Sequence, residues 1–161
     1  MLALKAEVQI SGQDGDRMVS INDFFHGFYM TAVQHGEILT EIRIPVPRNK
    51  FGSAYHKEER KVGDYATAGV AVAIEIDDNG VCTNAGIGLT NVNPLPMKVE
   101  RSEAVLIGSR LTTEDIATAA KYAAEDCSPS EDLRGDEDYK RHLVKVITKR
   151  MLNKAIQRAK S

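Results

Sequence analysis

A long stretch of small and β-branched residues followed by a tight-turn signal most constrains this fold. Residues 66–76 read ATAGVAVAIEI, a composition that favours a long strand. The next residues, 78–80, read DNG, and Asn-Gly tolerates the positive φ angles of a two-residue hairpin loop. Alternate residues then share one face of a returning strand: Val81, Thr83, Ala85, Ile87 and Leu89. With a strand over 51–57, the sequence predicts a three-stranded antiparallel sheet over residues 51–91.

The chain after this sheet predicts helices. Residues 98–107 form a short helix that Gly108 ends. A capping box at 112–115 starts a second helix, and Asp136 caps a last, longer helix that reaches residue 158. In the last helix apolar residues recur every four positions: Tyr139, Leu143, Ile147, Met151 and Ala155. Strands followed by helices predict an α+β fold, with the sheet packed on a C-terminal helical bundle over 98–158.

The first 47 residues contain a separate set of strands. Residues 6–10 and 18–21 flank the turn-forming stretch SGQDGD and predict a hairpin. Residues 37–45 alternate again, and two prolines stop that strand because proline cannot donate to a sheet ladder. We therefore expect two domains, a partial subdomain of strands and loop over 1–47 and a C-terminal domain over 48–161.

Composition excludes several functions. The 161 residues include 23 acids and 21 bases, so the net charge of −2 predicts no general attraction to nucleic acid or anionic membranes. No apolar run approaches the roughly 20 residues of a membrane span, and the N-terminus is unlike a signal peptide. Cys82 and Cys127 lack metal-ligand spacing, as do the four histidines. We expect a cytoplasmic protein with two buried free thiols and no metal site.

Two motifs have competing interpretations. Gly86-x-Gly88-x-x-Asn91 approaches a dinucleotide fingerprint, but it lies within a strand and lacks the third glycine. Residues 140–161 contain eight Lys or Arg and no acid. This basic helix is typical of a solvated face, and the alternatives are a docking surface for a partner subunit and a nucleic-acid contact. The absence of interleaved aromatic residues argues against nucleic acid.

The connection between the first two long strands is the main candidate site. It reads YHKEERKVGDYA over residues 55–66, and Lys57, Arg60 and Lys61 concentrate positive charge near Tyr65. Together they could cradle an electron-rich heterocycle, with Lys57 donating to a carbonyl and Tyr65 stacking on the ring. The alternative is a charged surface loop in which lysines and glutamates neutralise each other. Spacing alone favours that plainer alternative.

Several segments in order carry a family resemblance. They are residues 36–45 (GEILTEIRIP), 54–57 (AYHK), 60–66 (RKVGDYA), 86–90 (GIGLT), 103–108 (EAVLIG), 132–135 (DLRG) and 139–141 (YKR). Together they resemble the flavin (medium) subunit of molybdenum hydroxylases, above all that of the aerobic carbon monoxide dehydrogenase type. The resemblance runs along nearly the whole chain.

This resemblance implies a place in an FAD-dependent oxidoreductase complex. Such complexes carry a molybdopterin centre on a large subunit and [2Fe-2S] clusters on a small subunit, and electrons pass from these to FAD and then to an external acceptor. Lys57 and Tyr65 match positions that contact the flavin, and Leu39 matches an apolar flavin contact. Arg60, Lys61 and Asp64 are supporting neighbours. No residue of this chain is expected to be catalytic, because the substrate reacts at the molybdenum subunit.

One departure from the family pattern shapes the expected role. Family members carry two glycine-rich loops for the FAD pyrophosphate ahead of the position of Met1, and this sequence has neither. We therefore expect either a fragment or half of a split flavin subunit, whose N-terminal half supplies the phosphate site. The isolated chain would then be inactive. The alternative function is a flavin-free scaffold or interaction module of the same complex.

Overall fold

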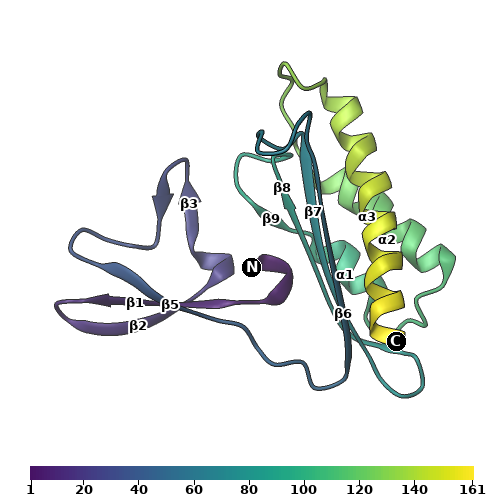
Figure 1. Cartoon of the computed structure of the whole chain (residues 1–161), viewed down its shortest axis with the longest axis horizontal. Coiled ribbons are helices and arrows are strands. Elements are labelled where there is room, and N and C mark those ends of the chain that lie inside the picture. The colour runs from purple at the N-terminus through teal and green to yellow at the C-terminus, as the bar shows by residue number, and fades with distance from the viewer.

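The largest of three antiparallel sheets, called the larger sheet below, holds most of the core. In the computed structural model, which describes residues 1–161, its strands in spatial order are β6 (Lys50–Glu58), β7 (Ala68–Ile76), β8 (Cys82–Thr90) and β9 (Met97–Lys98) (Figure 1). The predicted three-stranded sheet over 51–91 is therefore confirmed. The two-residue strand β9 extends this sheet and includes Lys98, the first residue of a predicted helix, because Lys98 pairs with Gly88.

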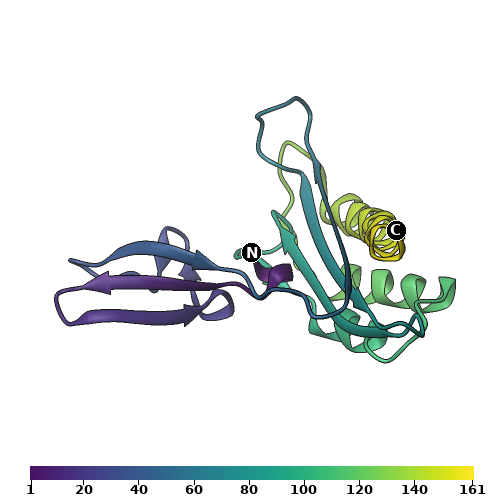
Figure 2. The same ribbon diagram turned by 60° about the horizontal axis from the view of Figure 1, so that its bottom comes forward.

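Three helices cover one face of this sheet: α1 (Glu100–Leu106), α2 (Thr113–Asp126) and α3 (Glu137–Lys160) (Figures 1 and 2). The predicted capping box of α2 is present, since the side chains of Thr112 and Asp115 each accept from the other's backbone amide. Asp136 caps α3, and Gly108 follows the end of α1 with a φ of 83°. The α+β class is confirmed. No helix is both long enough and apolar enough to cross a membrane.

The helices and the sheet enclose one large core. Its 25 buried residues include Val70, Val72 and Ile74 from the central strand β7, and Leu152 from α3. Gly52 on β6 allows the closest approach, because a Cβ atom at this position would lie 1.9 Å from the carbonyl oxygen of Ala155. The backbone of α3 therefore lies directly against β6.

The stripe predicted for α3 is wrong at its first turn. Tyr139 is 46% exposed, whereas Ile147, Met151 and Ala155 are buried as expected. Lys140 was assigned to a solvated basic face, yet it is only 2% exposed. A strict four-residue repeat drifts around a helix by about 40° per step, so it cannot follow one buried face over six turns.

The connection between β7 and β8 is longer than the two-residue Asn-Gly hairpin that was predicted. Residues 77–81 form it, and the Asp77 carboxylate accepts hydrogen bonds from the amides of Asn79 and Val81. Gly80 has a φ of 77°, but Asn79 does not adopt a positive φ. The side chain of Asp77 therefore organises this turn, and Gly80 supplies its one positive φ.

A β-bulge changes the face predicted for the start of β8. Ile76 pairs with Cys82 and Glu75 with Asn84, which leaves Thr83 as an extra residue. Thr83 is consequently exposed while Cys82 faces the core, and the later residues of the predicted face are buried as expected.

Both cysteines are free and buried, as predicted. Cys82 belongs to β8, and Cys127 ends α2. Burial raises the pKa of the Cys82 thiol to about 11 and also raises the pKa of Cys127.

The N-terminal residues form a second, smaller sheet. Its order is β2 (Gly15–Ser20), β1 (Glu7–Gly12) and β5 (Ile38–Arg43), and the predicted hairpin of the first two strands is confirmed. A hairpin of β3 (Phe25–Gly27) and β4 (Met30–Thr31) projects from it (Figure 1). Val8, Ile10 and Ile21 form its small core, and Leu39 packs against them. The division into domains at residue 47 stays a prediction.

The first residues of the chain lie on the face of the larger sheet that the helices leave open. A short 3-10 helix, η1 (Leu2–Leu4), contacts β8 there, and Figure 2 shows the smaller sheet extending away from this point. A Cβ atom at Gly86 would lie 2.0 Å from the carbonyl oxygen of Ala3. A Cβ atom at Gly88 would lie 3.3 Å from the side chain of Leu2. These glycines therefore permit close packing of two chain segments, which explains the motif without a bound phosphate.

Replacing Gly86 with alanine should displace η1 from the larger sheet. The new methyl group would overlap the Ala3 backbone, and overpacking of this kind costs about 1–3 kcal/mol. Gly88→Ala is the matched control, because it adds the same methyl group two residues along the same strand, where the nearest atom lies 3.3 Å away instead of 2.0 Å. Urea denaturation should show a clearly larger loss of unfolding free energy for Gly86→Ala. Equal losses would contradict the close approach of η1.

Candidate functional site

The open face of the larger sheet has a floor of small residues. Strand pairing aligns Lys57, Gly69 and Thr90 in one row across the sheet. The next row aligns Tyr55, Ala71 and Gly88 in the same way. Only β6 contributes long side chains to these two rows, so a flat surface lies beside Tyr55 and Lys57.

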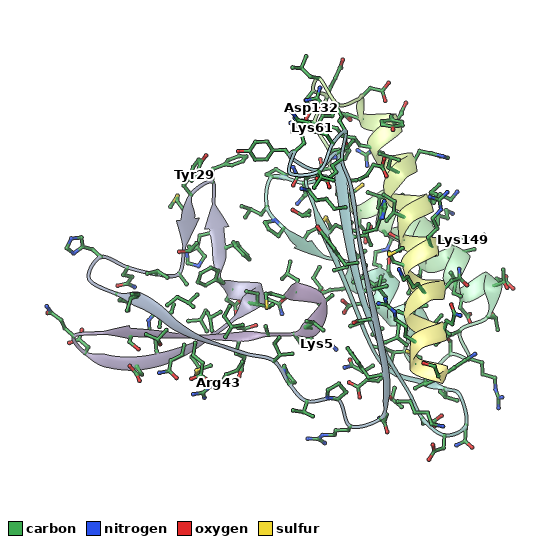
Figure 3. All side chains as sticks on the ribbon, in the orientation of Figure 1. Lys5, Tyr29, Arg43, Lys61, Asp132 and Lys149 are labelled. Carbon is green, nitrogen blue, oxygen red and sulfur yellow. The ribbon has the colours of Figure 1, made fainter.

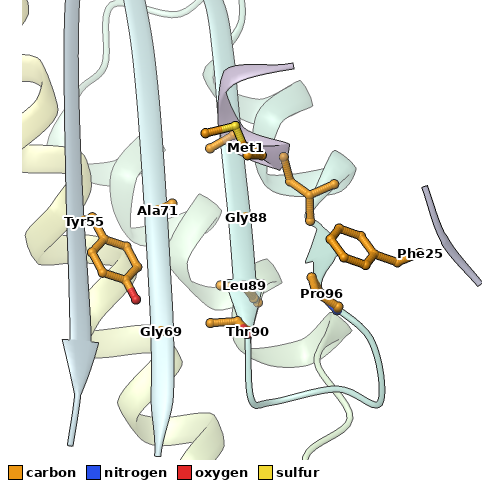
Figure 4. Close-up of a pocket in the computed structure, with 11 residues that line it drawn as sticks. Met1, Phe25, Tyr55, Gly69, Ala71, Gly88, Leu89, Thr90 and Pro96 are labelled. Atoms are coloured by element: carbon orange, nitrogen blue, oxygen red, sulfur yellow. The ribbon is translucent and has the colours of Figure 1, made fainter. Parts of the chain in front are cut away.

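A cavity of about 300 Å³ lies over this floor. Gly69, Gly88 and Thr90 line its base, Tyr55 lines one side, and Phe25 of the smaller sheet's hairpin approaches from the other (Figure 4). The cavity is mainly apolar, and the hydroxyl groups of Tyr55 and Thr90 are its polar side-chain groups. Parts of the chain far apart in sequence therefore build one concave site, as is typical of small-molecule pockets.

The loop of residues 59–67 leaves the end of β6 and returns into β7. The Thr67 amide donates to the Glu58 carbonyl over 2.7 Å and closes the loop at its base. The Lys57 ammonium donates to the Asp64 carbonyl oxygen over 2.5 Å and lies 2.6 Å from a carboxylate oxygen of Glu59. The Lys57 side chain is 32% exposed, so this ammonium ties the loop to the sheet and remains accessible from one side.

The carboxylate of Asp64 organises the rest of the loop. One oxygen accepts from Arg60 Nε over 3.0 Å. The other accepts from the Tyr65 amide over 2.8 Å and from a guanidinium nitrogen of Arg134 over 3.2 Å. These bonds lower the pKa of Asp64, with the hydrogen bond from Arg60 as the largest cause. The carboxylate therefore fixes the backbone on which the next side chain stands.

Tyr65 presents its ring to solvent. The residue is 76% exposed although its backbone is fixed, and the guanidinium carbon of Arg134 lies 5.6 Å from the ring centroid. This distance is within the range of a cation–π contact. An exposed aromatic ring on an anchored loop is available for stacking against a flat ligand.

The structure brings most of the predicted site residues together. Lys57, Arg60, Asp64 and Tyr65 share the contacts just described. Lys61 lies on the same loop, but its side chain is exposed and makes no ion pair. Leu39 lies apart from them on β5, where it packs against the small core of the other sheet. Its predicted contact with a flavin stays a prediction.

Sequence reasoning missed two contributors to this region. Arg134 reaches Asp64 across 70 positions of sequence, and no local pattern reveals such a contact. The hairpin of β3 and β4 is the second contributor: Phe28 lines a cavity of about 340 Å³ together with Asp132 and Lys140. Figure 3 shows Tyr29 at the hairpin tip, across from Lys61 and Asp132. The dense aromatic sequence of this hairpin was a usable signal.

Comparison with known families covers both parts of the chain. Residues 53–155 match the CO dehydrogenase flavoprotein C-terminal domain, and residues 1–47 match the FAD binding domain in molybdopterin dehydrogenase. The chain belongs to the CO dehydrogenase flavoprotein family. The resemblance inferred from the sequence motifs is therefore confirmed.

Relatives in this family align with nearly the whole of this chain. The carbon monoxide dehydrogenase medium chain of Afipia carboxidovorans is 40% identical over 100% of this chain and 56% of its own length. The glyceraldehyde dehydrogenase medium chain of Sulfolobus acidocaldarius is 32% identical over 92% of this chain and 52% of its own length. The chain thus spans about half the length of the curated relatives that it matches.

Solved structures confirm the fold of the family in this chain. Carbon monoxide dehydrogenase from Hydrogenophaga pseudoflava superposes with a TM-score of 0.92 at 41% identity, over 98% of this chain and 54% of that one. Quinoline 2-oxidoreductase from Pseudomonas putida 86 superposes with a TM-score of 0.87 at 33% identity, over 100% of this chain and 55% of that one.

The contribution of Asp64 to stability should depend on pH in the acid range. Folding lowers the pKa of this carboxyl below its ordinary value of 3.8, so the ionised form stabilises the folded state. That stabilisation is complete above about pH 4 and is lost as the pH falls through the lowered pKa. Urea denaturation should therefore give Asp64→Asn a lower free energy of unfolding than the wild type at pH 6. This gap between the two proteins should narrow at pH 3.

The exposed turn residue Asp14 supplies the control, because its carboxylate makes no hydrogen bond or ion pair. Asp14→Asn should have the same free energy of unfolding as the wild type at both pH values. A gap for Asp64→Asn that is as wide at pH 3 as at pH 6 would contradict the assigned contacts.

Proposed function

We propose that this chain holds the isoalloxazine end of FAD in the flavin subunit of a carbon monoxide dehydrogenase-like molybdenum hydroxylase. The subunit would carry electrons from [2Fe-2S] clusters through FAD to an external acceptor. In this proposal Lys57 and Tyr65 contact the isoalloxazine ring directly, and Leu39 adds an apolar contact from β5. Arg60, Lys61 and Asp64 support the loop, and none of these residues transforms the substrate.

The anchored, exposed ring of Tyr65 is the observation that carries this proposal. Most exposed tyrosines belong to side chains that are free to turn, but here Asp64 fixes the backbone and Arg134 lies over the ring. Lys57 is tied to the same loop and projects from the open face of the sheet. A flat ring with a cation beside it fits an aromatic ligand that carries carbonyl groups.

The residues present fit the flavin ring of the cofactor. FAD, when bound, would supply the capacity to accept electrons one at a time from the iron–sulfur clusters and to store two of them for an external acceptor. An ammonium group has three donors; Lys57 gives one to the Asp64 carbonyl and also forms an ion pair with the Glu59 carboxylate. A further donor of Lys57 can bind a ring carbonyl, and its positive charge would favour a reduced, anionic ring. Tyr65 can cover the ring and exclude water from one of its faces.

The phosphate groups of the cofactor need residues outside those described for this site. Backbone amides at a glycine-rich turn before a helix commonly bind such groups. We propose that the remaining part of the flavin subunit supplies them, and that an iron–sulfur small subunit and a molybdenum large subunit complete a cytoplasmic complex. The isolated chain would then be inactive. The two free thiols support a reducing compartment.

Removing either ring contact should weaken flavin binding in the complete complex. Lys57→Ala removes the donor to the ring, and Tyr65→Ala removes the stacking surface, each of which should cost about 1 kcal/mol or more. The measurements are the FAD content of the purified complex and the rate at which the complex reduces its bound FAD. Tyr65→Phe should retain the flavin because it keeps the ring.

The control is Lys149→Ala on α3, where the lysine is exposed and makes no ion pair. It should leave flavin content and reduction unchanged. Native flavin content and reduction in both Lys57→Ala and Tyr65→Ala would refute the site. A native complex without any flavin would instead support the flavin-free scaffold.

A further inference from the structure

We propose that Arg134 is a positioning residue of this site, holding the Tyr65 ring in the orientation that receives the ligand. The inference rests on the proposed function, because it concerns the same ring. Arg134 lies in one of the segments that carry the family resemblance, residues 132–135, but that resemblance assigns it no role. Its contacts in the folded chain indicate one.

Arg134 contacts Tyr65 through two routes. Its guanidinium lies 5.6 Å from the centroid of the Tyr65 ring. One of its nitrogens also donates over 3.2 Å to the Asp64 oxygen that accepts from the Tyr65 amide. A single carboxylate oxygen therefore joins the backbone of the tyrosine to the group that lies over its ring. This arrangement restricts the ring from one side and leaves its other side exposed.

The arginine is itself held by a buried anchor on α3. The Asp132 carboxylate accepts from the Arg134 amide over 2.8 Å and lies 2.9 Å from the ammonium of Lys140. The side chain of Lys140 is only 3% exposed, and it also donates to the Ser130 carbonyl over 2.7 Å. A buried ammonium requires such partners. The loop that carries Arg134 is thus fixed to the helical layer, independently of the loop that carries Tyr65.

The burial of this network separates it from ordinary surface ion pairs. The side chains of Arg134 and Asp64 are 20% and 11% exposed, whereas those of Lys50 and Asp78 in a surface pair are 57% and 94% exposed. The Nε atom of Arg134 is buried without an acceptor. An unsatisfied buried donor is unfavourable for folding. The guanidinium thus leaves one donor without an acceptor in the position where it lies over the Tyr65 ring.

The chain contains a matched arginine for comparison. The guanidinium of Arg101 lies 4.1 Å from the ring centroid of Tyr122, and it pairs with the carboxylates of Glu125 and Asp126. This second arginine–tyrosine–carboxylate group lies among α1 and α2, away from the open face of the sheet. Loss of Arg101 removes the same kinds of contact without touching Tyr65.

The experiment compares Arg134→Gln, Arg134→Lys and Arg101→Gln in the complete flavin-containing complex. The readouts are the rate of FAD release and the residual fluorescence of bound FAD, which a stacked tyrosine quenches. Arg134→Gln should release FAD about threefold to fivefold faster, the effect of losing a partly exposed cation–π contact, and should fluoresce more strongly. Arg134→Lys should recover part of both properties, and Arg101→Gln should match the wild type.

A double variant shows whether Arg134 acts through Tyr65. In a Tyr65→Ala background, Arg134→Gln should change neither readout further. An unchanged Arg134→Gln single variant, or a full effect in the Tyr65→Ala background, would overturn the inference and leave the proposed function intact. Native flavin release and fluorescence in Tyr65→Ala alone would overturn the proposed function instead. If Arg134→Gln fails to fold, Lys140→Met loosens the same anchor and should shift both readouts in the same direction.

Discussion

Burial of one face of the larger sheet against α3 is the constraint on which the rest of this structure depends. The core of 25 residues lies between the sheet and the helical layer, to which α1 and α2 contribute beside α3. Gly52 permits α3 to approach β6 closely, so the helix backbone lies directly against that strand. The opposite face carries no α-helix, and η1 and the β3–β4 hairpin approach it only in part.

The candidate site arises from this asymmetry. Small residues on the open face admit η1 at Gly86 and leave a cavity nearer Gly69. The strand ends are ordered by ion pairs instead of apolar packing, and the partly buried carboxylate of Asp64 is central to them. Charged groups in such positions are conspicuous in a chain whose other ion pairs are mostly exposed. The larger sheet thus positions the candidate site, and the loops at its strand ends supply the charged and aromatic side chains.

Local sequence patterns were sufficient for the longer strands, the helix caps and the two buried thiols, but not for the short strands β3, β4 and β9. They failed at two details of the β7–β8 hairpin and at one contact between residues distant in sequence. The side chain of Asp77 overrides the Asn-Gly signal, and one bulge moves Thr83 to the other face. The loop containing Lys57 and Tyr65 was found because charge and an aromatic residue are close in sequence. Arg134 was not, since its partner is 70 positions away.

The two buried cysteines have a consequence for how this chain can be observed. A thiol reacts as the thiolate, and burial both raises the pKa of Cys82 to about 11 and removes it from reagents. Its labelling by a disulfide reagent therefore requires the layer between β8 and the helices to open. Cys127 reports the end of α2 in the same way. The labelling rates of the two thiols would therefore report two different local openings, one at β8 and one at the end of α2.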